Sequence, residues 1–467
     1  MMRWLIGLLV LVLVAAGAAY YVAGRGSPPV IAIEQPKAVV GQTGELVVTI
    51  ETPGGKVASL AVALEQNGQS TALLNLDGAT MLKAQDASGA SDTGAITQTG
   101  PNTIQFTRPL NKKSLPALQP GAAKITVSVA RPSFLNLRTL SSSAAKDFQV
   151  RLAPPQLAVL STKHYVNLGG SEMVVYRASP ADVQSGVRVG DIEYPGFPLA
   201  GADPAVRVAF FALLPDQDLK TPIDAFARDE AGNQTTASFV DDVFPKPMKR
   251  SRIPIDDAFI NKTVPGIIAN SPELKMAGPS GDLLADFLKV NGELRRSNAE
   301  TIAAFSKQTA ATKLWKEPFL QLGNSQVEAG FADHRTYVYG GKEVDQQVHL
   351  GFDLAVTAHV PVAAANDGIV LNASWIGIYG NCVIIDHGLG VQSLYGHLQS
   401  FDVKVGDRVT RGQIVGRSDS TGLAGGDHVH FTMLVGGRMV NPVEWWDPHW
   451  MQDRVDRKLN EAGAAGR

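Results

Sequence analysis

Histidine and aspartate residues recur in two short stretches of the C-terminal third, at a spacing that suits β-strands. Over residues 347–354, His349 and Asp353 alternate with four apolar residues, and His428 and His430 are separated by a valine. Because side chains alternate between the two faces of a strand, each stretch would point its polar side chains to one side. In a helix, residues two apart would point to roughly opposite sides. The pattern therefore predicts two strands that present imidazole and carboxylate groups to one site.

These groups suit zinc. Imidazole nitrogen and carboxylate oxygen both bind Zn²⁺, and a catalytic zinc site uses three protein ligands and leaves a fourth position for water. A further histidine, His397, closes a Tyr-Gly-His segment on another alternating stretch, residues 391–398. Five side chains are thus available for a metal that needs three, so the residues predict a zinc site with two additional polar groups beside it.

The motifs H-x-x-x-D, Y-G-H and H-x-H, in this order, resemble the LytM/lysostaphin-type zinc endopeptidases of bacterial cell walls. The resemblance covers only residues 330 to 447, and no motif position departs from the pattern. It implies a zinc metalloendopeptidase that hydrolyses the peptide cross-links of peptidoglycan. It also implies that His349, Asp353 and His430 bind the metal and that His397 and His428 are catalytic.

Two other classes of protein are alternatives to the enzyme. A non-catalytic wall-binding regulator or activator of other hydrolases would be expected to lack some zinc ligands, whereas every motif residue is present here. Residues 405–416 also resemble the hairpin of biotinyl or lipoyl carrier domains, but no lysine lies between Lys404 and Lys458 to carry the cofactor. The enzyme is therefore the favoured interpretation.

Composition excludes some partners and bonds. The formal net charge of −2 gives no broad electrostatic footprint for nucleic acid. A single cysteine, Cys382, excludes an internal disulfide, and its apolar surroundings predict a buried thiol.

The first 27 residues predict export. Residues 4–23 form an apolar run of about the ~20 residues that span a bilayer as a helix. We expect a transmembrane anchor, although Ala16-Gly17-Ala18 could be a signal-peptide cleavage site. Either interpretation places the chain from Arg25 onward outside the cytoplasm, in the cell envelope, and the anchor would tie it to the inner membrane.

The remaining chain predicts a mainly β, multidomain protein. Short strand-like runs separated by Gly, Pro, Asn and Ser are typical of β-sandwiches, and we expect immunoglobulin-like modules at residues 28–153 and 156–245. A basic linker and helical interval should follow at 246–312, an antiparallel β-sheet peptidase domain at 313–450, and a tail at 451–467. The 467 residues suit about three domains at ~150 residues each.

Some details of the front regions stay open at this stage. The spacing of Ser297 and Glu300 predicts a capping box at the start of a helix. The helical interval could pack beside the peptidase domain or govern access to it, and a protein regulator could release the front modules from the active site. Since these regions lack visible chemistry, we expect a fragment from Lys313 onward to remain active. His334 is expected to have a structural or substrate-rim role. The other histidines, expected to have surface, turn or packing roles, are His164, His359, His387 and His449.

Overall fold

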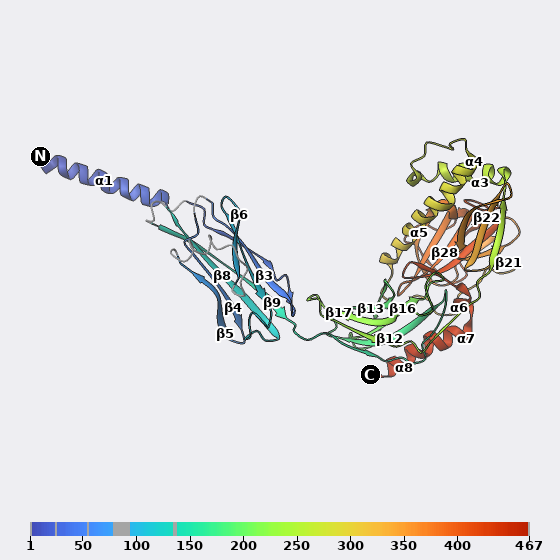
Figure 1. Cartoon of the computed structure of the whole chain (residues 1–467), viewed down its shortest axis with the longest axis horizontal. Coiled ribbons are helices and arrows are strands. Elements are labelled where there is room, and N and C mark those ends of the chain that lie inside the picture. Colours follow the sequence, from blue (N-terminus) through green and yellow to red (C-terminus); the bar gives the residue numbers. More distant parts are fainter. Residues whose placement is uncertain (1, 24–25, 54–55, 78–93, 134–137, 466–467) are drawn as a thin grey trace. The chain divides into compact units, whose positions relative to one another are not determined.

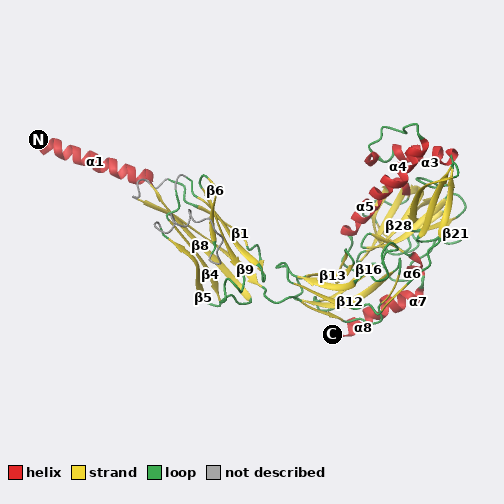
Figure 2. Cartoon of the chain, in the orientation of Figure 1, coloured by secondary structure: helices red, strands yellow, loops and turns green. Residues whose placement is uncertain are grey.

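The computed structural model describes all residues except 1, 24–25, 54–55, 78–93, 134–137 and 466–467. Most of the regular structure is β (Figures 1 and 2), which confirms the predicted fold class. The chain divides into two compact units, residues 1–154 with 228–234, and residues 155–227 with 235–467. The finer domain boundaries stay predictions.

The first unit begins with helix α1, Met2–Ala23. Within the part of the chain that the structure describes, no helix combines the length and apolar character needed to cross a membrane.

Two antiparallel-rich sheets with one core follow in the first unit. Their strand orders are β1-β3-β7-β6 and β2-β9-β8-β4-β5. Alternate residues of β3, such as Leu46, Val48 and Ile50, are fully buried, so the period of two in the sequence fills the space between the sheets. A sandwich is confirmed here, while its immunoglobulin-like character stays a prediction. The strands are β1 Val30–Gln35, β2 Val39–Val40, β3 Gly44–Glu51, β4 Ser59–Gln66, β5 Gln69–Leu76, β6 Ala95–Gly100, β7 Thr103–Leu110, β8 Gly121–Ser133 and β9 Arg138–Val150.

A second set of sheets opens the second unit. The orders are β10-β12-β16-β15 and β14-β13-β17-β18, with a parallel pair β11-β19 beside them. The strands are β10 Gln156–Val159, β11 Tyr165–Asn167, β12 Ser171–Ser179, β13 Gln184–Val189, β14 Ile192–Pro195, β15 Phe197–Pro198, β16 Val206–Ala212, β17 Ile223–Arg228, β18 Gln234–Ser238 and β19 Asp242–Phe244.

The C-terminal region contains a ten-stranded antiparallel sheet, as predicted, and a separate three-stranded sheet β20-β22-β23. The large sheet runs β21-β24-β31-β28-β27-β26-β29, and β25, β30 and β32 pair at its sides. The strands are β20 Arg250–Ile255, β21 Gln326–Ala329, β22 Asp333–Tyr339, β23 Lys342–His349, β24 Phe352–Ala355, β25 Pro361–Ala363, β26 Gly368–Trp375, β27 Asn381–Gly388, β28 Val391–Phe401, β29 Arg408–Val409, β30 Ile414–Ser418, β31 His428–Val435 and β32 Arg438–Val440.

Both faces of the large sheet are covered. Strands β27 and β31 are buried over nearly their whole length. One face, including Val383 and Met433, shares a core with the second sandwich, and the other face, including Cys382 and Leu434, shares a core with the helical interval. Cys382 is a buried free thiol, as predicted.

The helical interval is thus part of the core around the large sheet. Its helices are α3 Asp257–Ala269, α4 Leu283–Lys289 and α5 Arg295–Ala304, with a π-helical turn at Val290–Leu294 and 3₁₀ turns at Pro272–Leu274 and Phe305–Gln308. The predicted capping box is wrong, because Ser297 lies inside α5, which continues from the π turn. Residues 250–252 of the predicted linker form the start of β20, which pairs with β22. A fragment beginning at Lys313 would lack this strand and helices α3 to α5, and its activity stays a prediction.

The predicted tail is also helical. Helices α6 Pro442–Trp446, α7 Pro448–Met451 and α8 Arg457–Ala465 follow β32, with a π turn at Gln452–Asp456. The fully buried Lys458 of α8 donates from Nζ to Glu172 Oε1 of β12 at 2.9 Å. Helix α8 is therefore docked on the second sandwich.

Candidate metal centre and its cleft

The strand predicted over residues 347–354 is broken in two. His349 ends β23 in the three-stranded sheet, and Asp353 lies in β24 of the large sheet. Gly351 lies at the break, where an added Cβ would be 2.4 Å from His430 Nε2. The single-strand prediction is wrong, but both side chains reach one site because the chain changes sheets there.

The H-x-H stretch forms β31, as predicted. Strand β24 pairs with it in the register Asp353↔His430 and Ala355↔His428. Val429 packs in the core on the opposite face from the two histidines. This pairing brings Asp353 beside His430.

Three atoms converge at this junction. His349 Nε2 is 2.9 Å from Asp353 Oδ1 and 3.1 Å from His430 Nδ1, and the last two atoms are 3.2 Å apart. The two imidazoles are buried, and the Asp353 side chain is 13% exposed. Of the described residues that could hold a metal ion, this is the more buried group.

The hydrogen bonds of His349 indicate that these three atoms suit a metal ion. Its Nδ1 is 3.0 Å from the carbonyl oxygen of Gly330, which can only accept, so Nδ1 carries a proton. In the neutral ring, Nε2 then presents a lone pair to a carboxylate oxygen and another imidazole nitrogen. A proton could satisfy one pair of these atoms, whereas a metal ion satisfies all three. At metal–ligand distances of about 2.0–2.2 Å, tetrahedral zinc separates its ligands by roughly 3.3–3.6 Å, close to the separations here.

His397 and His428 lie side by side next to this group. Their ring centroids are 4.7 Å apart, and His428 Nε2 is 3.5 Å from Asp353 Oδ1. His397 Nδ1 donates to Thr421 O at 2.6 Å, and His428 Nδ1 donates to Gly426 O at 2.9 Å. In both neutral rings the Nε2 lone pair is therefore free of the backbone.

Burial and charge act in opposite directions on these groups. Burial would raise the pKa of Asp353, but His349 and the contacts with His428 and His430 hold this pKa well below its usual value. Burial lowers the pKa of His397 strongly and that of His430 to about 4. For His428, burial also acts to lower the pKa, but Asp353 outweighs it and the net shift is upward. Asp353 is thus an anion among imidazoles, as a cation site requires.

One supporting residue was missed in the sequence. Arg335 of β22 places Nη2 2.9 Å from Asp353 Oδ2, and its Nε is 3.6 Å from Asp333 Oδ2. It therefore holds the carboxylate oxygen that does not face the three-atom group. Nothing in the local pattern of residues 331–337 distinguishes this arginine from a surface residue, because its partner comes from another sheet.

A cleft of about 470 Å³ opens over the histidines. The helical interval and the strand before it contribute Ile253, Phe259 and Arg295 to its wall. The interval therefore both packs on the large sheet and borders the site, and the sequence alone had left both roles open.

The remaining histidines lie outside the three-atom group. His164 is buried and its Nε2 contacts Ser161 Oγ at 2.8 Å, and His387 is fully buried between Asp367 O and Ser393 Oγ, which corrects its predicted turn or surface role. His359 lies with Asp419 and Asp427 in a second, more exposed group of potential ligand atoms. His334 contacts Met248, and His449 is exposed.

Comparison with known proteins matches part of this region to a family. Residues 347–442 match Peptidase family M23. A stretch of 97 residues is 39% identical to the DD-carboxypeptidase/endopeptidase Mpg of Neisseria meningitidis serogroup B, covering 21% of this chain and 22% of that relative. A stretch of 96 residues is 38% identical to the peptidoglycan DD-endopeptidase ShyA of Vibrio cholerae, again covering 21% of this chain and 22% of the relative.

A solved structure is also similar to part of the chain. A crystal structure of a peptidase M23 from Pseudomonas aeruginosa covers 60% of this chain and 94% of its own, at 19% identity and a TM-score of 0.37. The chain matches less than a quarter of the length of the two curated relatives, 22% of each.

Proposed function

We propose that this chain, whose residues 347–442 are a Peptidase family M23 domain, is an exported zinc metalloendopeptidase that hydrolyses peptide cross-links of bacterial peptidoglycan. The observation that carries the proposal is the convergence of His349 Nε2, Asp353 Oδ1 and His430 Nδ1 within 2.9 to 3.2 Å. Peptidoglycan enters as the substrate through the relatives, of which one is named a DD-carboxypeptidase/endopeptidase and another a peptidoglycan DD-endopeptidase.

These three residues would hold the metal. Asp353 supplies negative charge, and Arg335 on its second oxygen keeps Oδ1 directed at the two imidazoles. When bound, zinc would polarise the scissile carbonyl and make a water molecule more acidic.

His397 and His428 would handle protons and developing charge. Each donates Nδ1–H to a backbone carbonyl, so each ring is held with Nε2 available. One Nε2 accepts a proton from the attacking water and later delivers it to the leaving amine. The other, once protonated, donates to the oxyanion that forms on the scissile carbonyl. No glutamate of an H-E-x-x-H motif is present in this region to act as base.

The substrate determines the compartment. Peptidoglycan lies outside the cytoplasmic membrane, so we propose that the protein acts in the cell envelope, on the extracytoplasmic side. A protein regulator of the cleft stays a prediction.

Digestion of intact sacculi by the purified protein tests this proposal. Mass spectrometry of the soluble products should identify muropeptides released by cleavage within cross-links, and removal of zinc by a chelator should stop their release. A folded, zinc-loaded protein that binds sacculi and releases nothing would instead indicate a non-catalytic wall-binding regulator.

A further inference from the structure

His397 adopts an unusual backbone conformation for a residue inside a strand. Its φ is +62°, in the left-handed region that non-glycine residues rarely occupy. It lies in β28, where the pairing with β27 steps from Tyr395↔Val383 to Leu398↔Asn381, so the strand has one extra residue. His397 is therefore at a β-bulge, which turns its side chain relative to a regular strand. Such a conformation persists only where its surroundings hold it.

The residue that holds it is Thr421. The Thr421 carbonyl accepts from His397 Nδ1 at 2.6 Å. Its hydroxyl donates to Leu398 O at 2.8 Å and accepts from Asn381 N at 3.1 Å. Leu398 and Asn381 are partners across the bulge, so the hydroxyl links the two strands at the point where their regular pairing is interrupted.

The backbone around Thr421 has no room to shift. A Cβ on Gly380, whose φ is +62°, would lie 2.4 Å from the Thr421 carbonyl carbon. One on Gly422, whose φ is +76°, would lie 2.5 Å from Gly380 N. Leu423 N also donates to Ile378 O at 2.9 Å. The carbonyl that accepts the hydrogen bond from His397 Nδ1 is therefore fixed relative to β27.

We propose that Thr421 is a positioning residue for His397: its hydroxyl secures the bulge, and its carbonyl keeps the imidazole in the Nδ1–H form with Nε2 free for proton transfer. This inference rests on the proposed function for its kinetic consequence. Its structural part, the tautomer of His397, does not depend on catalysis.

The test compares Thr421→Val, which keeps the shape and removes the hydroxyl, with Thr421→Ser, which keeps the hydroxyl, in the full-length zinc-loaded protein. We expect Thr421→Val to lower kcat by about 10- to 100-fold while KM and zinc content stay near wild type. Thr421→Ser should stay within about threefold of wild type. Thr235→Val is the matched control, because the Thr235 hydroxyl also donates to a backbone carbonyl, Pro155 O at 2.6 Å, in the second sandwich.

Nitrogen-15 NMR of labelled histidines reads the tautomer directly, with the His397 signals identified by their loss in His397→Gln. Wild type should give the Nδ1–H pattern for His397, and Thr421→Val a mixture of tautomers. The same tautomer and kcat in Thr421→Val as in wild type would overturn the proposal, as would equal losses in Thr421→Val and Thr421→Ser. Thr421→Ala carries the same expectation as Thr421→Val if the valine variant does not fold. Should the wild type prove inactive, the tautomer measurement still decides the positioning role.

Discussion

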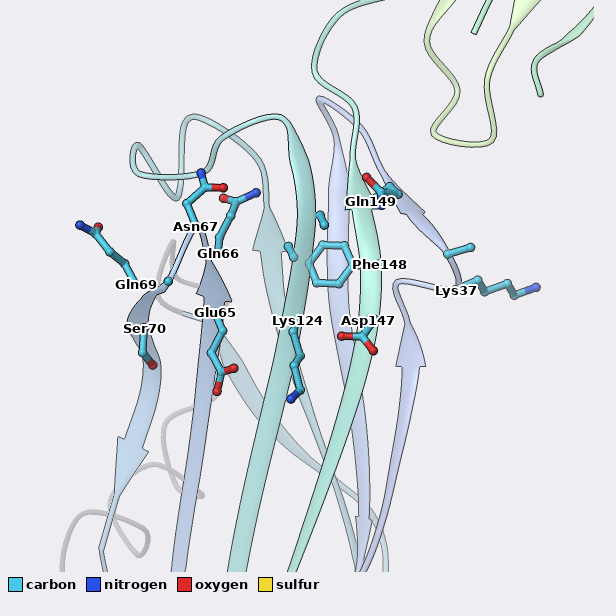
Figure 3. Close-up of a pocket in the computed structure, with 14 residues that line it drawn as sticks. Lys37, Glu65, Gln66, Asn67, Gln69, Ser70, Lys124, Asp147, Phe148 and Gln149 are labelled. Atoms are coloured by element: carbon cyan, nitrogen blue, oxygen red, sulfur yellow. The ribbon is translucent and has the colours of Figure 1, made fainter. Parts of the chain in front are cut away.

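The histidine cleft and the pocket on the first sandwich differ in how their polar side chains are oriented, and their volumes do not reflect this difference. The pocket in Figure 3 has a volume of about 670 Å³, larger than the 470 Å³ of the cleft. Its charged residues Glu65, Lys124 and Asp147 face one another across strands β4, β8 and β9. Lys37 and Gln69 lie at opposite ends of it. These groups alternate in charge and reach solvent.

In the cleft, by contrast, buried lone pairs point at one place. His349, His397 and His428 each have Nδ1 bound to a backbone carbonyl. The fold has therefore already fixed which nitrogen each ring presents. Fixed orientation, rather than the number of polar groups or the space between them, distinguishes a candidate catalytic site from a polar hollow.

The largest effect should come from removing a converging atom. Asp353→Ala leaves two imidazoles with no anion, too few ligands for a closed first shell. We expect zinc to fall from about one ion per chain to near zero and hydrolysis of sacculi to fall to background. Metal analysis by mass spectrometry measures this, and His430→Ala should behave in the same way. Full zinc retention in either variant would remove that residue from the ligand set.

The next effect separates the two histidines of β31. His428→Ala should keep zinc, because His428 is not among the residues whose atoms form the three-atom group. Its hydrolysis rate should fall by something like 10²- to 10⁴-fold, as expected for loss of a positioned acid–base group, and His397→Ala should do likewise. If His428→Ala lost the metal and His430→Ala kept it, the two roles would be exchanged.

A smaller effect is expected from removing the arginine that pairs with the Asp353 carboxylate. Arg335→Met removes the donor to Asp353 Oδ2 while preserving much of the side-chain volume. Loss of an outer partner of a metal ligand costs about 10- to 100-fold in metal affinity, and we expect a decrease of that size in a competition titration with a zinc chelator. Arg408→Met, an exposed residue of β29, is the control and should leave the affinity unchanged. An unaltered affinity in Arg335→Met would mean that Asp353 needs no such support.

The smallest effect is expected in the first-sandwich pocket. Lys124→Ala and Asp147→Asn should change zinc content and the hydrolysis rate of a soluble muropeptide by less than about twofold. Surface substitutions of this kind usually change the free energy of unfolding by no more than about 0.5 kcal/mol, so the fold should stay intact. A loss as large as that of His428→Ala would contradict the contrast between the two regions.

The sequence predicted the site better than its surroundings. The alternation around His428 and His430 identified β31 because that strand carries polar groups on one face only. The same alternation runs unbroken through residues 347–354, so it could not reveal that the chain changes sheets at Gly351. The close approach of His430 to that glycine is a tertiary contact with no local signal.

The sequence did not predict how the regions around the large sheet pack, for a related reason. The helical interval has its own amphipathic pattern. This pattern indicates that one face of each helix is buried, but it does not indicate which element covers that face. Arg335 and Lys458 look like ordinary surface residues in the sequence. Their partners, Asp353 and Glu172, come from other elements, and only the assembled fold brings them together.

The ion pair between Glu172 and Lys458 has a consequence for the order of folding. The two residues are 286 positions apart, and both are fully buried. A chain that emerges from its N-terminus must hold Glu172 without this partner until Lys458 is available. An unpaired carboxylate in an apolar core is costly, so strand β12 should not reach its final packing before then. The second unit should accordingly complete its core only once Lys458 has been made, and a chain truncated before Lys458 would remain vulnerable to proteolysis.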